Sequence, residues 1–464
     1  MIKNIGFLIL CALFVGIFAG CDKKPQDLDA NQAQSVTNSF DFGALKSEAE
    51  AQNFDLSKIT LKDSKDSNAT APQIAKSLAK FYLLSGEIEG AKAMLYLKIS
   101  STPDFANVGE NQNNNLAYIS GKIVRGGEIF TLNGEVDFAQ NASQSMAQNA
   151  NQNSKQDSTQ NSDLKGDSTQ KQDSVQNSTN SANPQIIQLE ISSEGRNLQD
   201  LQTSKQDSKN AKQDKITQIF EAQIAQNGEV SGRFVGSGFF KDGTSVDFKR
   251  AENQINEIAI FGVSVAQKHT GKDFDGTSKE FNFNTSLQIP VIVSTKLNFA
   301  LDKINAHLRD ITDFSEYANA EDSFNFDGIS AFNVAYIDEK VIVFSNYNYI
   351  YSGGAHGIYS DEAVAFSVEG GARIANEPKI LLKDENDAKL RTMIKERLVA
   401  EYENSVDENA PLSKFKITPN GVEFYWGVYE IAAYAVGIVS IHFDFTELAP
   451  FVREDSPYYY LFVK

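Results

Sequence analysis

The sequence predicts an α+β protein, with an antiparallel β-rich N-terminal domain followed by a compact α+β C-terminal domain whose antiparallel sheet is packed by helices. With 464 residues, of which 41% are hydrophobic and 11% aromatic, the chain can bury at least two cores. Short alternating apolar segments bounded by turn residues recur between residues 94 and 248. From about His269 onward, similar segments alternate with two stretches of helical periodicity.

The first 20 residues have the pattern of a signal peptide. Lys3 precedes an uncharged apolar run over residues 5–19, which is shorter than the about 20 residues that a membrane-spanning helix needs. The run ends in Phe18-Ala19-Gly20-Cys21, which resembles the lipobox of bacterial lipoproteins, with Phe18 in place of the usual Leu. The resemblance implies cleavage before Cys21, acylation of Cys21 with fatty acids such as palmitate, and a lipid anchor. An ordinary signal peptide or a transmembrane anchor with a chance cysteine is the alternative.

Cysteine and histidine usage argues against disulfides and metal sites. Cys11 lies in the segment to be removed, so the mature chain keeps only Cys21 and forms no internal disulfide. The four histidines are far apart, and no pair has the i, i+4 spacing of a helical zinc site. We therefore expect no metal and no cofactor.

The charge is acidic and unevenly distributed. The chain has a net charge of −18, which argues against nucleic-acid binding. Residues 269–464 hold 17 Lys and Arg against 30 Asp and Glu, a net charge of −13, whereas the first 268 residues have a net charge of only −5. The acidity of the C-terminal part serves either solubility or the attraction of a basic partner.

Residues 21–70 are polar and predict a flexible tether. Within them, Asp66-Ser67-Asn68-Ala69-Thr70 matches the acidic-x-Asn-x-Ser/Thr pattern that some bacteria N-glycosylate. In a chain so rich in Asn and Ser, a chance match explains this segment equally well. Residues 71–266 form the predicted β-rich domain, interrupted by a low-complexity insert over residues 140–184 with a recurring Lys-x-Asp-Ser unit. The insert has too few large apolar side chains to offset the entropy of ordering and predicts a disordered loop.

Specific elements follow from local patterns. Residues 71–84 predict a helix, because Ile74, Leu78, Phe81 and Tyr82 share one helical face. Residues 129–138 predict two hairpin arms around Asn133-Gly134. Further strands are expected over residues 94–99, 116–124, 186–191, 216–225, 230–240 and 244–248.

The C-terminal domain spans residues 269–464. Helices are expected around residues 297–308, 390–398 and 447–452, because their apolar residues recur at helical spacing. Strands are expected over residues 281–293, 334–337, 341–351, 363–368, 415–417, 422–426 and 438–445.

A set of motifs in this domain carries a second resemblance. A Tyr-rich strand leads into Gly353-Gly354-Ala355-His356-Gly357, and the segment Tyr429-Glu430-Ile431-Ala432-Ala433-Tyr434-Ala435-Val436-Gly437 precedes an alternating strand. In this order the motifs resemble the extracellular domain shared by RsiV-type anti-sigma factors and PdaC-type peptidoglycan deacetylases. The resemblance covers residues 276–464, and in the RsiV-like proteins this domain binds lysozyme. Nothing in the first 268 residues resembles a sigma-binding segment or a deacetylase.

No residue pattern points to catalysis. The closely spaced His pair with Asp of a metal-dependent deacetylase is missing, and we expect a non-enzymatic protein. His356 is either a catalytic base or, as the favoured interpretation, a turn residue held by hydrogen bonds. Tyr429 and Tyr434 are interpreted as core or rim aromatics. Asp361 and Glu362 are interpreted as a solvated turn, with a glycosidase pair as the alternative.

Three functions remain open for this protein of the cell envelope, anchored by lipid to the inner or outer membrane. The first is a module that binds lysozyme or another basic protein, with Tyr351, His356 and Tyr359 as candidate contacts. The second is a peptidoglycan-binding wall module. The third, and least favoured, is an accessory to an envelope hydrolase or deacetylase.

Overall fold

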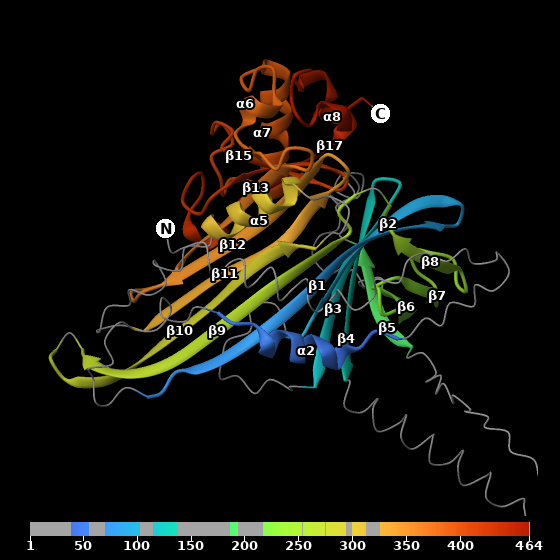
Figure 1. Ribbon diagram of the computed structural model, residues 1–464. Helices are drawn as coiled ribbons and strands as arrows, with labels where there is room; N and C mark the ends of the chain where they lie inside the picture. The colour runs from blue at the N-terminus through green and yellow to red at the C-terminus, as the bar shows by residue number, and fades with distance from the viewer. Residues whose placement is uncertain are drawn as a thin grey trace, which may run out of the picture. The chain divides into compact units, whose positions relative to one another are not determined.

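The first eight strands of the protein form a closed ring (Figure 1). The structure is a computed structural model that describes residues 39–54, 70–102, 115–137, 186–193, 217–252, 254–273, 275–293, 299–311 and 325–463. The ring strands are β1 (Gln73–Ile88), β2 (Ala91–Ser100), β3 (Leu116–Arg125), β4 (Glu128–Asp137), β5 (Ile187–Ser193), β6 (Thr217–Ile224), β7 (Val230–Val235) and β8 (Ser245–Arg250). Each pairs antiparallel with the next, and β8 returns to β1 where Leu84 faces Arg250.

Strand β1 also belongs to a second row of strands. Its residues 73–82 pair with β9, so the ring and the following strands make one fourteen-stranded sheet. The added strands are β9 (Glu257–Lys272), β10 (Ser278–Ile292), β11 (Phe326–Ile337), β12 (Val341–Tyr351), β13 (Ile358–Ser367) and β14 (Arg373–Ile374). Pairing is antiparallel except between β10 and β11, which run parallel and are joined through helix α5 (Phe299–Ile311). A parallel pair needs such a long crossover, so this one pair departs from the predicted antiparallel sheet.

A separate three-stranded sheet lies near the C-terminus of the chain. It consists of β15 (Lys414–Thr418), β16 (Gly421–Trp426) and β17 (Val439–Asp444). The helices α6 (Pro378–Leu381), α7 (Ala388–Tyr402) and α8 (Phe445–Leu448) and the short turns η5 (Tyr434–Val436), η6 (Ala449–Phe451) and η7 (Tyr459–Leu461) accompany it. Leu390, Ile394 and Leu398 of α7 are fully buried in one core with Trp426 and Phe443. The α+β, strand-rich fold class is confirmed.

The helix predicted over residues 71–84 is wrong, because this segment is strand β1. Leu78, Phe81, Tyr82 and Leu84 are all buried, since this part of the strand is covered on both faces, whereas Ile74 is 42% exposed. A strand buried on both faces carries a continuous apolar run, which contains the i, i+3, i+4 spacing of a helix by chance.

The hairpin predicted around Asn133-Gly134 is also wrong. Both residues lie in the middle of β4, and the turn falls at Gly126-Gly127, which have φ values of 60° and 88°. A Cβ on Gly134 would lie 2.5 Å from Cδ2 of Leu189, so this glycine serves the close approach of β4 and β5.

Part of the predicted tether is ordered. Residues 42–51 form helix α2 (Phe42–Ala51), which is capped by Asp41 and buries Phe42, Leu45 and Ala49. The tether prediction is therefore wrong for this segment. Cys21, Asn68 and the insert at residues 140–184 lie outside the described residues. No helix among the described residues is long and apolar enough to cross a membrane.

The boundary predicted between residues 266 and 269 falls inside strand β9. Phe81 and Tyr96 of the ring share a core with Phe332 and Phe344 of β11 and β12. The described chain from residue 39 onward accordingly forms one compact unit.

Candidate functional site

Tyrosines follow the end of strand β12 at every second position. Tyr347, Tyr349 and Tyr351 therefore lie on one face of the sheet. Tyr349 faces Tyr359 of β13 across the strand pair, and the rings of Tyr347 and Tyr359 are 6.1 Å apart. The antiparallel pairing thus gathers several phenol rings on one patch.

A glycine-rich turn carries His356 back over this patch. Gly353 and Gly354 have φ values of 99° and 94°, which favour glycine, and the Tyr351 hydroxyl donates to the Gly354 carbonyl at 3.1 Å. A Cβ on Gly357 would lie 2.5 Å from the Tyr349 ring. Only glycine at position 357 lets the chain pass so close to the tyrosine face.

The loop after β16 approaches from a distant part of the sequence. Its turn over residues 427–430 is held by Glu430, whose carboxylate accepts from the Gly427 amide and, at 2.8 Å, from the Ser413 hydroxyl. The turn gives Tyr429 a φ of 68°, a left-handed conformation that is costly for a tyrosine. Tyr429 is 57% exposed. The loop therefore presents an aromatic side chain to solvent on a strained backbone.

The two loops meet at His356. Its ring stacks on Tyr434 with centroids 3.7 Å apart and planes 18° apart, and its Nε2 lies 3.1 Å from the Tyr429 hydroxyl. The Tyr434 hydroxyl donates to the Gly357 carbonyl at 2.7 Å. We call these residues the His356 aromatic cluster: Tyr347, Tyr349, His356, Tyr359, Tyr429 and Tyr434.

The hydrogen bonds define the tautomer of His356. Nδ1 lies 3.0 Å from the Gly357 carbonyl, which can only accept, so Nδ1 carries the proton. Nε2 is then the acceptor for the Tyr429 hydroxyl. Within the described residues His356 has no carboxylate partner. This geometry supports the interpretation of His356 as a residue that joins two loops rather than as a base.

Three phenols of the cluster, those of Tyr347, Tyr349 and Tyr434, have raised pKa values and are neutral at physiological pH. Desolvation raises the pKa of Tyr434 above its usual value, and the neighbouring phenols of Tyr359 and Tyr429 raise it further. The pKa values of Tyr347 and Tyr349 are raised as well, chiefly by desolvation. Tyr347, Tyr349 and Tyr434 therefore offer rings and neutral hydroxyl donors rather than charge.

Two carboxylates of strand β13 are paired with lysines. Asp361 lies 3.1 Å from Lys416, and Glu362 forms an ion pair with Lys414. Burial lowers the pKa of Lys416, but the carboxylates of Glu423 and Asp361 outweigh burial and raise it overall. Asp361 and Glu362 lie in strand β13 and not in the predicted turn. Their side chains alternate between opposite faces, so they do not form a catalytic pair.

The predicted contact residues differ in their surroundings. His356 and Tyr359 belong to the cluster, whereas Tyr351 is bonded to the turn at Gly354. Tyr347 and Tyr349 were not among the predicted contact residues, although their alternation with Tyr351 along the strand indicates a shared face. The described residues contain no group of three or more His, Cys, Asp or Glu side chains that could hold a metal ion.

Comparisons with known proteins identify one region of the chain. Residues 379–446 match the family described as Protein of unknown function (DUF3298). This match includes Tyr429 and Tyr434 but not His356. No curated protein matches the chain.

Two solved structures of DUF3298 family proteins are similar to the chain. The protein from Bacteroides fragilis NCTC 9343 is 18% identical with a TM-score of 0.33, and the match covers 44% of this chain and 96% of that one. The protein from Pseudomonas aeruginosa PAO1 is 14% identical with a TM-score of 0.32, covering 42% of this chain and 94% of that one. The C-terminal part of the chain thus carries a DUF3298 domain, a domain of unknown function.

Proposed function

We propose that this protein is a non-enzymatic lipoprotein of the cell envelope, held to a membrane by a lipid on Cys21, whose C-terminal domain binds a basic protein through the His356 aromatic cluster. Lysozyme is the partner that the resemblance to RsiV-like domains implies. The observation that carries the proposal is the meeting of two distant loops at His356, which presents Tyr429 to solvent. Tyrosines on a rigid support are typical anchors of protein interfaces.

The charge of the domain complements this role. Residues 269–464 have a net charge of −13. Asp361 and Glu362 are paired with lysines, so the attraction comes from the other acidic residues of this part of the chain. Such a field accelerates encounter with a basic protein, while the neutral rings supply the contact.

Calorimetry with lysozyme and the chain over residues 22–464 tests the proposal. We expect binding that weakens as salt rises from ~0.05 to ~0.5 M, because screening removes the long-range attraction. Tyr429→Ala and Tyr434→Ala should each lower the affinity about tenfold or more, the size typical of an anchor residue. Tyr351→Ala and Tyr359→Ala should lower it as well.

The matched control is Tyr118→Ala. It removes a partly exposed tyrosine from strand β3 of the eight-stranded ring and should leave lysozyme affinity unchanged. Absence of binding at low salt, or equal binding by all variants, would contradict the proposal. The second candidate, a peptidoglycan-binding wall module, is supported by the exposed ring of Tyr429, on which a sugar could stack. Sedimentation with purified peptidoglycan distinguishes the two. A role as an accessory to a hydrolase or deacetylase stands third, with no observation in its favour.

A further inference from the structure

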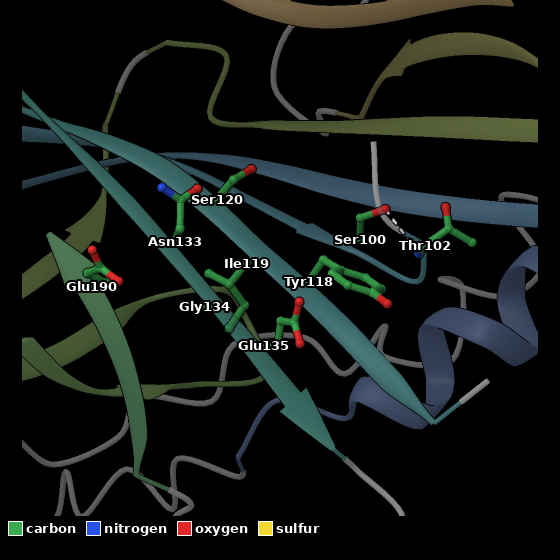
Figure 2. A pocket seen from close by; sticks show the side chains of 9 residues that line it. All are labelled: Ser100, Thr102, Tyr118, Ile119, Ser120, Asn133, Gly134, Glu135 and Glu190. Atoms are coloured by element: carbon green, nitrogen blue, oxygen red, sulfur yellow. Dashed lines mark hydrogen bonds between the residues drawn. The ribbon is translucent and has the colours of Figure 1, made fainter. Parts of the chain in front are cut away.

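The outer face of the eight-stranded ring is hollowed across β2, β3, β4 and β5. The depression has a volume of about 370 Å³ and is open to solvent (Figure 2). Two rows of side chains cross it. The strand register places Ser100, Tyr118 and Glu135 in one row, and Ser120, Asn133 and Glu190 in the other.

The two rows share a face because the intervening residues point the other way. Ile119, Leu132 and Leu189 alternate with the polar residues and are at most 2% exposed. An alternating polar face could simply be solvated surface. Two further observations describe this face, namely the state of its carboxylates and the close packing of its floor.

The carboxylates of the depression make no ion pair within the described residues, and Lys98, which continues the row of Ser120, bonds to Asn333 at 2.8 Å. Glu135 and Glu190 make no ion pair within the described residues, and the side chains of Asn133 and Glu190 have no hydrogen-bond partner there. Three other carboxylates of the ring do pair with a cation: Glu89 with Arg125 at 3.0 Å, Glu221 with Arg233 at 2.8 Å, and Glu229 with Lys249 at 3.7 Å. The depression therefore keeps strong acceptors and an amide available for a ligand.

The strands beneath the depression are closely packed. A Cβ on Gly134 would lie 2.5 Å from the Leu189 side chain, and one on Gly121 would lie 2.5 Å from the Tyr96 carbonyl. The strands therefore approach each other closely and hold the polar rows in place. Groups held in this way lose little conformational entropy when a ligand binds.

The chemistry of these groups selects a ligand class. Tyr118 and Glu135 lie side by side on paired strands (Figure 2). Burial, and then the Glu135 carboxylate, raises the pKa of the Tyr118 phenol, so the hydroxyl stays protonated and can donate. Two unpaired carboxylates repel phosphates and other anions. Acceptor carboxylates, an amide and an aromatic face together suit a ligand with many hydroxyl donors and apolar C–H faces.

We propose that this depression is a saccharide-binding site, in which Asn133, Glu135 and Glu190 receive the hydroxyl groups of a neutral sugar and Tyr118 supplies a stacking face. The site lies on the ring, away from the DUF3298 match at residues 379–446. It is independent of the function proposed for the aromatic cluster.

Titration of the chain over residues 22–464 with maltotriose and with tri-N-acetylchitotriose, followed by NMR or calorimetry, tests the site. Maltotriose carries hydroxyl groups alone, whereas tri-N-acetylchitotriose also carries acetamido groups. We expect at least one to bind with a Kd at or below about 10 mM. Glu190→Ala and Asn133→Ala should each weaken binding about tenfold, as loss of a hydrogen bond to a charged or amide group does.

Two matched variants sharpen the test. Tyr118→Phe keeps the ring and should keep most of the affinity, whereas Tyr118→Ala should lose it. Glu128→Ala, which removes an exposed carboxylate of β4 outside the depression, should bind the sugar like the unaltered chain. Absence of binding to both sugars at about 10 mM, binding that survives Glu190→Ala and Tyr118→Ala, or preferential binding of inorganic phosphate would each overturn the proposal.

Discussion

The Tyr429 hydroxyl lies 3.1 Å from Nε2 of His356, although 73 positions separate the two residues in the sequence. This contact joins the glycine turn after β12 to the strained loop after β16. Both segments also meet through the stacking of His356 on Tyr434. The contact surface of the proposed binding module therefore exists only when the large sheet and the small sheet are both folded.

Gly357→Ala should displace the Tyr349 ring and thereby disturb the His356 aromatic cluster. The new methyl group would lie 2.5 Å from the Tyr349 ring, at a position that is buried. We expect the free energy of unfolding to fall by about 1–3 kcal/mol, as overpacking usually costs, and lysozyme binding to weaken. Chemical denaturation measures the loss. Gly370→Ala is the control, because a Cβ there meets nothing within 4 Å, and an equal loss in both variants would refute the explanation.

Tyr429→Gly should separate stability from binding. Glycine adopts the φ of 68° without strain, so we expect the free energy of unfolding to rise by up to about 1 kcal/mol while lysozyme affinity falls. Glu403→Gly relieves a φ of 52° outside the cluster and should stabilise without affecting binding. If Tyr429→Gly lowered stability, the contacts of the tyrosine ring would outweigh the backbone strain at this position.

Acidification should destabilise the protein through His442. Burial lowers the pKa of His442 below its ordinary value of 6.5, the Arg397 cation lowers it further, and Asp444 and Glu423 oppose both. The unfolded chain then binds a proton near pH 6.5 that the folded chain does not. The stability contributed by neutral His442 is full above pH 6.5 and declines as the pH falls toward the folded pKa.

Denaturant titrations between about pH 7.5 and about pH 5.5 measure this dependence, a window chosen around the ordinary value of 6.5. In His442→Gln the decline over this window should be smaller than in the unaltered chain. If stability declined by the same amount in the His442→Gln variant, groups other than His442 would cause the pH dependence.

Cys21→Ala tests the lipid anchor. The apolar run over residues 5–19 ends in Phe18-Ala19-Gly20-Cys21, and acylation needs the Cys21 thiol. We expect the variant to accumulate as uncleaved precursor without incorporating labelled palmitate. Normal processing and release of the Cys21→Ala protein would instead identify an ordinary signal peptide.

Local patterns were enough to predict elements whose two faces differ. The strands expected over residues 116–124 and 415–417 are confirmed as β3 and β15, because polar and apolar residues alternate there. Patterns failed where both faces of an element are buried. Strand β1 pairs with β2, β8 and β9, and its apolar run contains the residue spacing that is typical of a helix.

Taken alone, the sequence determined the strand-rich α+β class, the acidic balance of the C-terminal part, and the glycine-flanked position of His356. Only the tertiary structure decided that β8 closes on β1, and that Tyr429 and Tyr434 lie against His356. Strand order and loop contacts depend on pairing between distant segments, whose free energy comes from burial that no local pattern records. The outer depression of the ring could not be predicted for the same reason. Its polar groups lie on four separate strands, and only the pairing register of these strands places them in two rows.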